Sequence, residues 1–162
     1  MGGGTFGNRT AVAEFNIWAD PEAAAVVFGY GGRLVMAGLD LTHQLLATPP
    51  RIAAVKARPG RLAAVLGDLF DFFSTTYIGR HDGIAGAAVH DPCAVLALTH
   101  PELLSSQRLH VAIETSGALT RGMTVIDRRD LKERPPGNCD VLISIDADAA
   151  WSVIVEAIGS YG

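Results

Sequence analysis

The spacing of apolar residues along the chain predicts a series of amphipathic helices. Asp20 is a good N-cap and Pro21 suits the first helical position, so a helix is expected to begin here and to end at the glycines that follow residue 28. Further helices are expected over 42–46, 51–57, 61–73, 91–97 and 148–158. In the helix over 61–73, apolar side chains at helical spacing are expected to face a core: Leu62, Val65, Leu66, Leu69, Phe70 and Phe73.

Shorter apolar runs predict strands over 33–39, 109–114, 123–127 and 141–145. The strands at 109–114 and 123–127 are expected to pair as antiparallel neighbours, because a short glycine-containing connection joins them. The segment 77–89 is rich in glycine and alanine and predicts a long loop, and 128–138 predicts a charged loop. Because helices and strands interleave, the expected fold class is α/β.

Length and composition indicate a folded domain with a sizeable core. The chain has 162 residues, of which 49% are hydrophobic, which excludes a disordered chain. Only 19% are charged, below the ~25% of an average soluble domain, and the mean hydropathy is +0.26. Two interpretations are open: the composition is rich in alanine and glycine, or part of the surface is apolar and meets a partner.

The charge balance and the apolar runs exclude several classes of partner. There are 13 Lys and Arg against 17 Asp and Glu, a net charge of -4 without a basic cluster, which argues against nucleic acid. No apolar run approaches the ~18 residues of a membrane span, and the first residues do not resemble a signal peptide. Cys93 and Cys139 form neither a metal-type pair nor a disulfide framework, which favours a reducing, cytoplasmic location.

Glu14 and Asn16 are the first candidates for ligand binding. They stand at alternate positions of a segment expected to be extended, so both side chains would project to one side. A carboxylate and a carboxamide placed together suit the hydroxyls of a polyol such as a sugar. Their alternative role is loop and cap chemistry.

His90 and Asp91 stand where the glycine-rich loop meets the helix expected over 91–97. His90 can act as a general acid, because the unperturbed pKa of histidine is ~6.5. Asp91 can either cap the helix or bind a hard cation, although one carboxylate falls short of the about six oxygens of a calcium site. In the preceding loop, Tyr77, Arg80 and His81 could close over a ligand or simply be exposed polar residues.

Several of these segments, taken in order, resemble the inosine–uridine-preferring nucleoside hydrolases. The resemblance spans nearly the whole chain. It rests on Met1-Gly2-Gly3-Gly4, Gly7-Asn8, Ala13-Glu14-Phe15-Asn16, Asp20-Pro21-Glu22-Ala23-Ala24, Gly38-Leu39-Asp40-Leu41-Thr42-His43, His90-Asp91-Pro92-Cys93-Ala94, and the stretch from Glu114 to Thr124. It implies a Rossmann-like, nucleoside-hydrolase-like fold, an open mixed sheet flanked by helices.

The resemblance also implies an activity and roles for individual residues. These enzymes hydrolyse the N-glycosidic bond of ribonucleosides to ribose and free base, through a calcium-bound water, in purine and pyrimidine salvage. By resemblance, Asp91 is a calcium ligand and His90 protonates the leaving base. The substrate-binding residues implied are Met1, Asn8, Glu14 and Asn16, with Tyr77 in a flap over the base.

One departure from the family pattern changes the expected activity. The aspartate cluster that supplies most of the family's calcium ligands has no match here, so residues 1–162 are expected to form a single domain resembling the C-terminal half of a nucleoside hydrolase. Two hypotheses follow: a nucleoside hydrolase, or a truncated, non-catalytic remnant that binds itself or a partner. The chain alone is expected to be inactive, and the sheet edge and helix faces left exposed predict a homo-oligomer.

Overall fold

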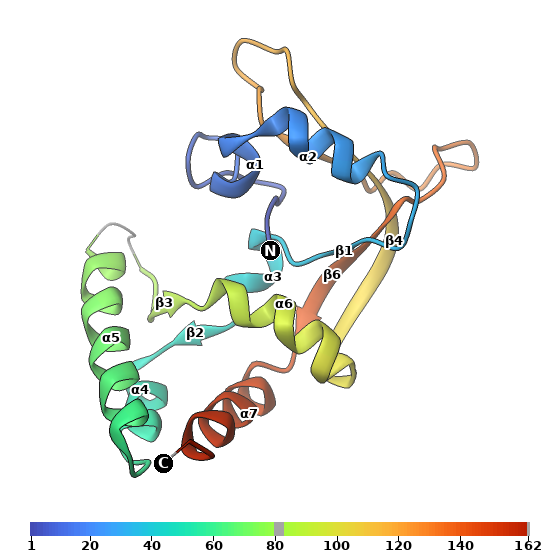
Figure 1. Cartoon of the computed structure of the whole chain (residues 1–162). Helices are drawn as coiled ribbons and strands as arrows, with labels where there is room; N and C mark the ends of the chain where they lie inside the picture. The colour runs from blue at the N-terminus through green and yellow to red at the C-terminus, as the bar shows by residue number, and fades with distance from the viewer. Residues whose placement is uncertain (80–82, 162) are drawn as a thin grey trace. The chain divides into compact units, whose positions relative to one another are not determined.

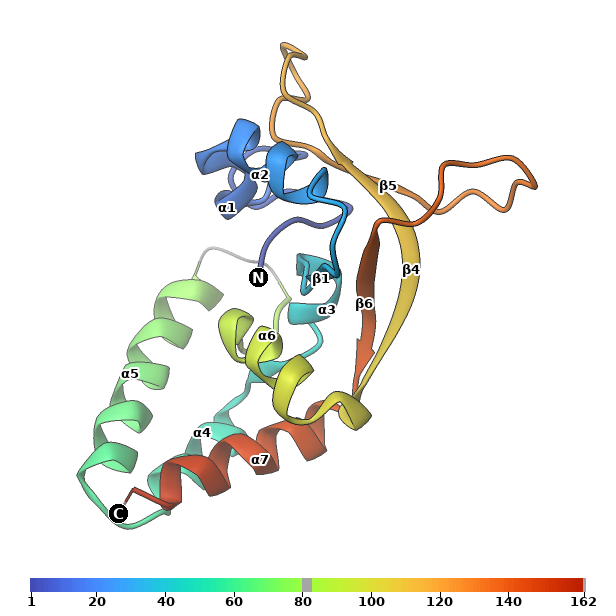
Figure 2. The same ribbon diagram turned by 45° about the vertical axis from the view of Figure 1, so that its right-hand side comes forward.

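The computed structural model describes residues 1–79 and 83–161, which form two compact units (Figures 1 and 2). The first unit comprises Met1–Thr42 and His90–Ser144, and the second comprises His43–Val89 and Ile145–Gly162. Each unit therefore contains segments that are distant in sequence. Whether the chain behaves as a single domain stays a prediction.

A mixed β-sheet forms the centre of the first unit. Its strands are β1 (Val35–Met36), β4 (Leu104–Ile113), β5 (Thr124–Asp127) and β6 (Cys139–Ile145), in the order β1-β6-β4-β5 among the residues described. β1 pairs in parallel with β6, and β4 pairs antiparallel with β5, with His110 opposite Asp127. The predicted mixed α/β sheet and the predicted antiparallel pair are both confirmed.

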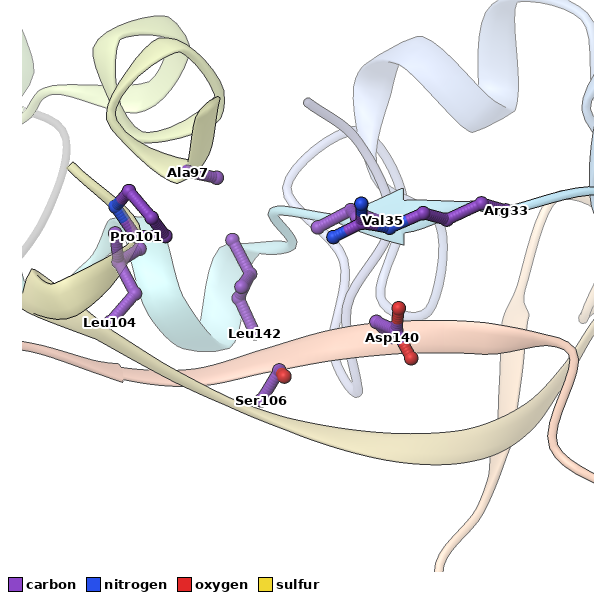
Figure 3. Close-up of a pocket in the computed structure, with 8 residues that line it drawn as sticks. All are labelled: Arg33, Val35, Ala97, Pro101, Leu104, Ser106, Asp140 and Leu142. Carbon is purple, nitrogen blue, oxygen red and sulfur yellow. The ribbon is translucent and has the colours of Figure 1, made fainter. Parts of the chain in front are cut away.

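Helices cover the two faces of this sheet. The first unit contains α1 (Phe15–Ala19), α2 (Pro21–Phe28), α3 (Leu39–Thr42), α6 (His90–Thr99) and the 3-10 helix η1 (Pro101–Leu103). Alternate residues of a strand point to opposite faces. The odd-numbered residues of β4 and β6, together with Met36 of β1, form a core with α1 and α2: Ile17, Phe28, Met36, Leu109, Val111, Cys139 and Val141. The residues between them line a hollow of about 100 Å³ beneath α6 (Figure 3).

The second unit is a group of helices with a short antiparallel strand pair. It contains β2 (Leu46–Ala47) and β3 (Ala87–Ala88), which are antiparallel, and α4 (Pro49–Lys56), α5 (Arg61–Ile78) and α7 (Ala147–Gly159). The three helices contact one another. Trp151 of α7 ties them together: its ring lies 5.5 Å from that of Phe70, and its Nε1 donates to the backbone oxygen of Arg51 at 3.0 Å.

One predicted helix and one predicted helix face are wrong. The helix expected over 42–46 is absent, because Thr42 ends α3 and Leu46 pairs in β2. The apolar positions of the helix over 61–73 do not all face a core, since Leu69 is 55% and Phe73 is 48% exposed. Small residues such as Gly67 form the buried face of α5 instead, and a Cβ at Gly67 would lie 2.4 Å from Cγ of Lys56 in α4.

Among the described residues, the helices are all too short or too polar to span a lipid bilayer.

Candidate functional site

Glu14 is the most buried charged side chain of the candidate site. It is 2% exposed and is the N-cap of α1, with its carboxylate accepting three backbone N–H groups. Oε1 accepts from Asn16 at 2.9 Å, and Oε2 accepts from Gly3 at 3.0 Å and Ile17 at 3.2 Å. The carboxylate therefore joins the N-terminal loop to the start of α1, and its orientation is fixed before any ligand binds.

The other predicted ribose-binding residues lie around Glu14. Asn16 donates from Nδ2 to the backbone oxygen of Met1 at 3.3 Å, and Oδ1 of Asn8 accepts from the backbone N–H of Phe15 at 2.9 Å. Asn16 lies in α1, so the expected extended segment with both side chains on one side is wrong. The contact of these residues arises from the helix cap and from the fold of the loop.

The glycines of the N-terminal loop permit a close approach of the backbone to the core. Gly3 has φ +76°, which disfavours residues with a Cβ, and a Cβ there would lie 2.8 Å from Oγ1 of Thr124. The backbone of this loop is hydrogen-bonded to the residue after β1 and to the first residue of α3. Gly2 N–H donates to the oxygen of Ala37 at 3.1 Å, and Leu39 N–H donates to the oxygen of Gly3 at 2.8 Å.

Helix α3 connects this loop to His90. Its first residue, Leu39, bonds the loop, and its last residue, Thr42, is fully buried with Oγ1 2.8 Å from Nδ1 of His90. The helix is about one turn long, ~5.4 Å, so the imidazole and the N-terminal loop are held on the two ends of one short element. Thr42 thus positions the predicted general acid.

Asp40, in the middle of α3, makes a second attachment of the loop. Its Oδ2 accepts from the backbone N–H of Thr5 at 2.8 Å, and its Oδ1 lies 3.6 Å from Nη2 of Arg128. Sequence reasoning missed the roles of Thr42 and Asp40, because 48 and 35 residues separate them from the groups they hold.

Asp91 lies in the first turn of α6, which begins at His90 rather than at the residue after it. It is exposed, and no group of three His, Cys, Asp or Glu side chains that could hold a metal occurs among residues 1–79 and 83–161. A calcium ion is usually coordinated by about six to eight oxygen atoms. The described residues therefore do not form a complete calcium site by themselves.

Tyr77 belongs to the second unit and lies in the last turn of α5, not in a loop. Its hydroxyl is 3.3 Å from Nε2 of His43, and burial raises its pKa. Arg80 and His81, the other two residues expected over the ligand, lie outside the described residues.

A model of the inosine-uridine preferring nucleoside hydrolase family matches residues 1–152. The chain belongs to this family. It is 42% identical over 168 residues to the inosine-uridine preferring nucleoside hydrolase of Leishmania major, and 41% identical over 162 residues to a pyrimidine-specific ribonucleoside hydrolase, RihA, of a Shewanella species. The resemblance found in the motifs is thereby confirmed.

The nucleoside hydrolase fold is confirmed by a solved structure of a relative. The purine-preferring ribonucleoside hydrolase from Gardnerella vaginalis superposes with a TM-score of 0.86 at 28% identity, covering 100% of this chain and 52% of that chain. The Leishmania and Shewanella relatives are also covered over 51% of their length. The chain thus spans about half the length of these nucleoside hydrolases and corresponds to their C-terminal half.

Neither cysteine of this chain fits a nucleophilic role. Cys93 and Cys139 are both buried and free. Burial raises the pKa of each thiol to about 11, so the reactive thiolate is scarce near neutral pH. Neither thiol is therefore a candidate nucleophile.

Proposed function

We propose that this chain carries the ribose-binding residues and the leaving-group acid of a ribonucleoside hydrolase. The reaction is the hydrolysis of the N-glycosidic bond to ribose and a free base. The single observation that supports it best is the cluster of Met1, Asn8, Glu14 and Asn16 around one buried carboxylate, in a chain of this family.

The residue types suit the charge that develops in this reaction. Departure of the base leaves positive, oxocarbenium-like character on the ribose ring. A carboxylate has about four lone-pair positions, and the described backbone N–H groups use three at Glu14, so it can accept a further hydrogen bond from a sugar hydroxyl. Because these amides already fix Glu14, its negative charge is preorganised and needs little rearrangement in the transition state.

His90 is the proposed proton donor to the departing base. A base leaves more readily as a neutral molecule than as an anion, and general acid catalysis typically contributes about 10²–10⁴-fold. The hydrogen bond to buried Thr42 holds the imidazole at its Nδ1. Thr42 is therefore a positioning residue in this proposal.

Asp91 is the residue proposed to bind calcium. Its exposed carboxylate would give one oxygen to a bound calcium ion, whose remaining ligands would lie outside the described residues. This incomplete donor set also favours the second candidate function, a non-catalytic, partner-binding chain. A cytoplasmic location and a role in nucleoside salvage stay predictions.

A hydrolysis assay separates the two candidate functions. The purified chain is incubated with inosine or uridine, with and without EGTA, and release of hypoxanthine or uracil is measured. We expect little release by the chain alone, and calcium-dependent release when the N-terminal half of the Leishmania relative is added. Release that persists in Asp91→Ala and in EGTA would contradict the calcium proposal. No release in either preparation would leave only the partner-binding function.

We also propose that the chain self-associates, because α5 presents an exposed apolar face. Leu69 is 55% and Phe72 is 73% exposed, and they lie three residues apart on one side of the helix. Sedimentation velocity is expected to show a dimer or larger oligomer that dissociates in Leu69→Lys/Phe72→Lys. The control is Arg61→Glu, which changes an exposed charge at the start of the same helix. A monodisperse monomer would contradict this proposal.

A further inference from the structure

Asp40 of α3 is the residue from which this inference starts. Its side chain is 22% exposed, and both of its oxygens bind one residue of the N-terminal loop. Oδ2 accepts from the backbone N–H of Thr5 at 2.8 Å, and Oδ1 accepts from Oγ1 of Thr5 at 2.5 Å. A hydrogen bond to an ionised acceptor is roughly twice as strong as one between neutral groups. The two bonds are therefore a strong attachment of the loop to α3.

Arg128, the first residue after β5, adds a positive charge beside the same carboxylate. Its Nη2 lies 3.6 Å from Oδ1 of Asp40. The N-terminal loop, α3 and the end of β5 thus meet at one side chain. An uncharged residue at position 40 would lose the attraction of this guanidinium as well as the hydrogen bonds to Thr5.

The loop that Asp40 holds has little conformational preference of its own. Gly2, Gly3 and Gly4 directly precede Thr5, and glycine loses more conformational freedom on folding than any other residue. Gly4 also lies close to Asp40, since a Cβ there would lie 3.3 Å from Oδ2. The groups that bind such a loop determine its position, and Asp40 binds it immediately after the glycines.

Thr5 lies between two parts of the candidate sugar site. Two residues before it, Gly3 N–H donates to Oε2 of Glu14 at 3.0 Å. Three residues after it, Oδ1 of Asn8 accepts from the backbone N–H of Phe15 at 2.9 Å. A displacement of Thr5 would therefore disturb both contacts, although Thr5 itself belongs to neither.

We propose that Asp40 is a positioning residue for sugar binding: through Thr5 it sets the position of the loop that carries Asn8 and binds Glu14. This inference rests on the proposed function, in which Glu14 and Asn8 bind the ribose. Asp40 does not touch the substrate, and it takes no part in proton transfer from His90. Its loss weakens binding of the substrate and of the transition state alike, which raises KM and leaves kcat nearly unchanged.

The test measures base release at several inosine concentrations, with calcium, in the full chain combined with the N-terminal half of the Leishmania relative. We expect Asp40→Ala to raise KM by about tenfold, because the loop loses two hydrogen bonds. Asp40→Asn should raise KM less, because the amide keeps one acceptor oxygen. The matched control, Asp130→Ala, removes an exposed carboxylate of the loop after β5 and is expected to keep the wild-type KM. A merely structural role of Asp40 would lower the amount of folded enzyme, and so the apparent kcat, without changing KM.

Thr5 variants test whether Asp40 acts through this residue. Thr5→Val removes the hydroxyl but keeps the shape of the side chain and the backbone N–H, and it is expected to raise KM by about threefold. Thr5→Ser restores the hydroxyl and should recover most of this loss. In the double variant Thr5→Val/Asp40→Ala, KM should equal that of Asp40→Ala alone, because the hydroxyl has already lost its acceptor. Multiplying effects of the two substitutions would overturn the proposal.

Amide hydrogen exchange of the chain alone, measured by NMR, is a readout that needs no turnover. We expect the Gly3 amide to exchange faster in Asp40→Ala than in the wild type or in Asp130→Ala, because the loop is released. Asp40→Asn is the variant measured if Asp40→Ala does not fold. A wild type that releases no base would contradict the proposed function. Release of base with an unchanged KM in the Asp40 variants, or unchanged exchange at Gly3, would overturn the role of Asp40.

Discussion

Glu14→Ala is expected to lower the free energy of unfolding of the first unit by about 3 kcal/mol or more. The carboxylate accepts the backbone N–H groups of Gly3, Asn16 and Ile17, and it is itself 2% exposed. Alanine leaves these donors without their acceptor, and each buried unsatisfied donor costs about 1–3 kcal/mol. Loss of an N-cap alone costs only about 1 kcal/mol. The size of the effect therefore reports whether Glu14 ties the loop to α1.

The measurement has to distinguish the two units. The chain has two tryptophans, Trp18 in the first unit and Trp151 in the second, so their indole N–H signals in a ¹H–¹⁵N spectrum report each unit separately during urea unfolding. Glu14→Gln keeps one oxygen acceptor and is expected to have an intermediate effect. Glu102→Ala, an exposed carboxylate of η1, is the control. A Glu14→Ala chain as stable as Glu102→Ala would show that the buried hydrogen bonds contribute little.

The parts of the fold that sequence reasoning predicted well are those with local signals. The helix after Asp20 begins and ends as expected, because Asp20 caps it with an oxygen on Ala23 N–H and Gly29 follows its last residue. Helix α7 is similarly capped by Asp146. The antiparallel pair β4 and β5 also follows from a short connection between two apolar runs.

The failures have physical causes, some local and some that act over long range. The helix expected over 51–57 begins two residues earlier, because Pro49 and Pro50 occupy its first turn, where a missing N–H costs nothing. The strand expected over 33–39 shortens to Val35–Met36, because only these residues pair with β6. Residues beyond Met36 bond instead to the N-terminal loop, which no local periodicity can predict.

The candidate site was likewise predicted only in part from the sequence. Motif spacing found Glu14 and Asn16, but it left their ligand and cap roles as alternatives. Glu14 is in fact a cap, and this is compatible with ligand binding, since the cap is what fixes the carboxylate near Met1 and Asn16. The contact of Thr42 with His90 joins residues 48 positions apart and depends on α3 packing against α6. Only the folded structure could reveal it.

The low charge of the composition left two interpretations open, and the exposed side chains favour one of them. Large apolar residues remain on the surface of α2, α5 and α6, among them Val26, Phe72 and Leu98, which are 74%, 73% and 82% exposed. A composition that is merely rich in alanine and glycine does not require such residues. They support the interpretation that part of the surface is apolar and meets a partner, which stays a prediction.

His90→Ala is expected to have the largest effect on turnover, a fall in kcat of about 10²–10⁴-fold. It is measured in the preparation that releases base, either the chain alone or the chain with the N-terminal half of the Leishmania relative. Without a proton donor the base must depart as an anion, whereas the proposed ribose-binding residues around Glu14 are unchanged. KM is therefore expected to change much less than kcat. The control is His100→Ala, because His100 lies just after α6 and its Nδ1 contacts only the neighbouring Thr99 among the hydrogen bonds described for it.

Thr42 tests whether the position of the imidazole, and not only its presence, matters. Thr42→Val removes the 2.8 Å contact to Nδ1 in a fully buried position, and kcat is expected to fall by about tenfold. Thr42→Ser restores the hydroxyl and should recover most of the activity. Release of base is followed at several substrate concentrations, because loss of a positioning contact should lower kcat more than it changes KM. A His90→Ala chain with the wild-type rate would exclude His90 as the proton donor.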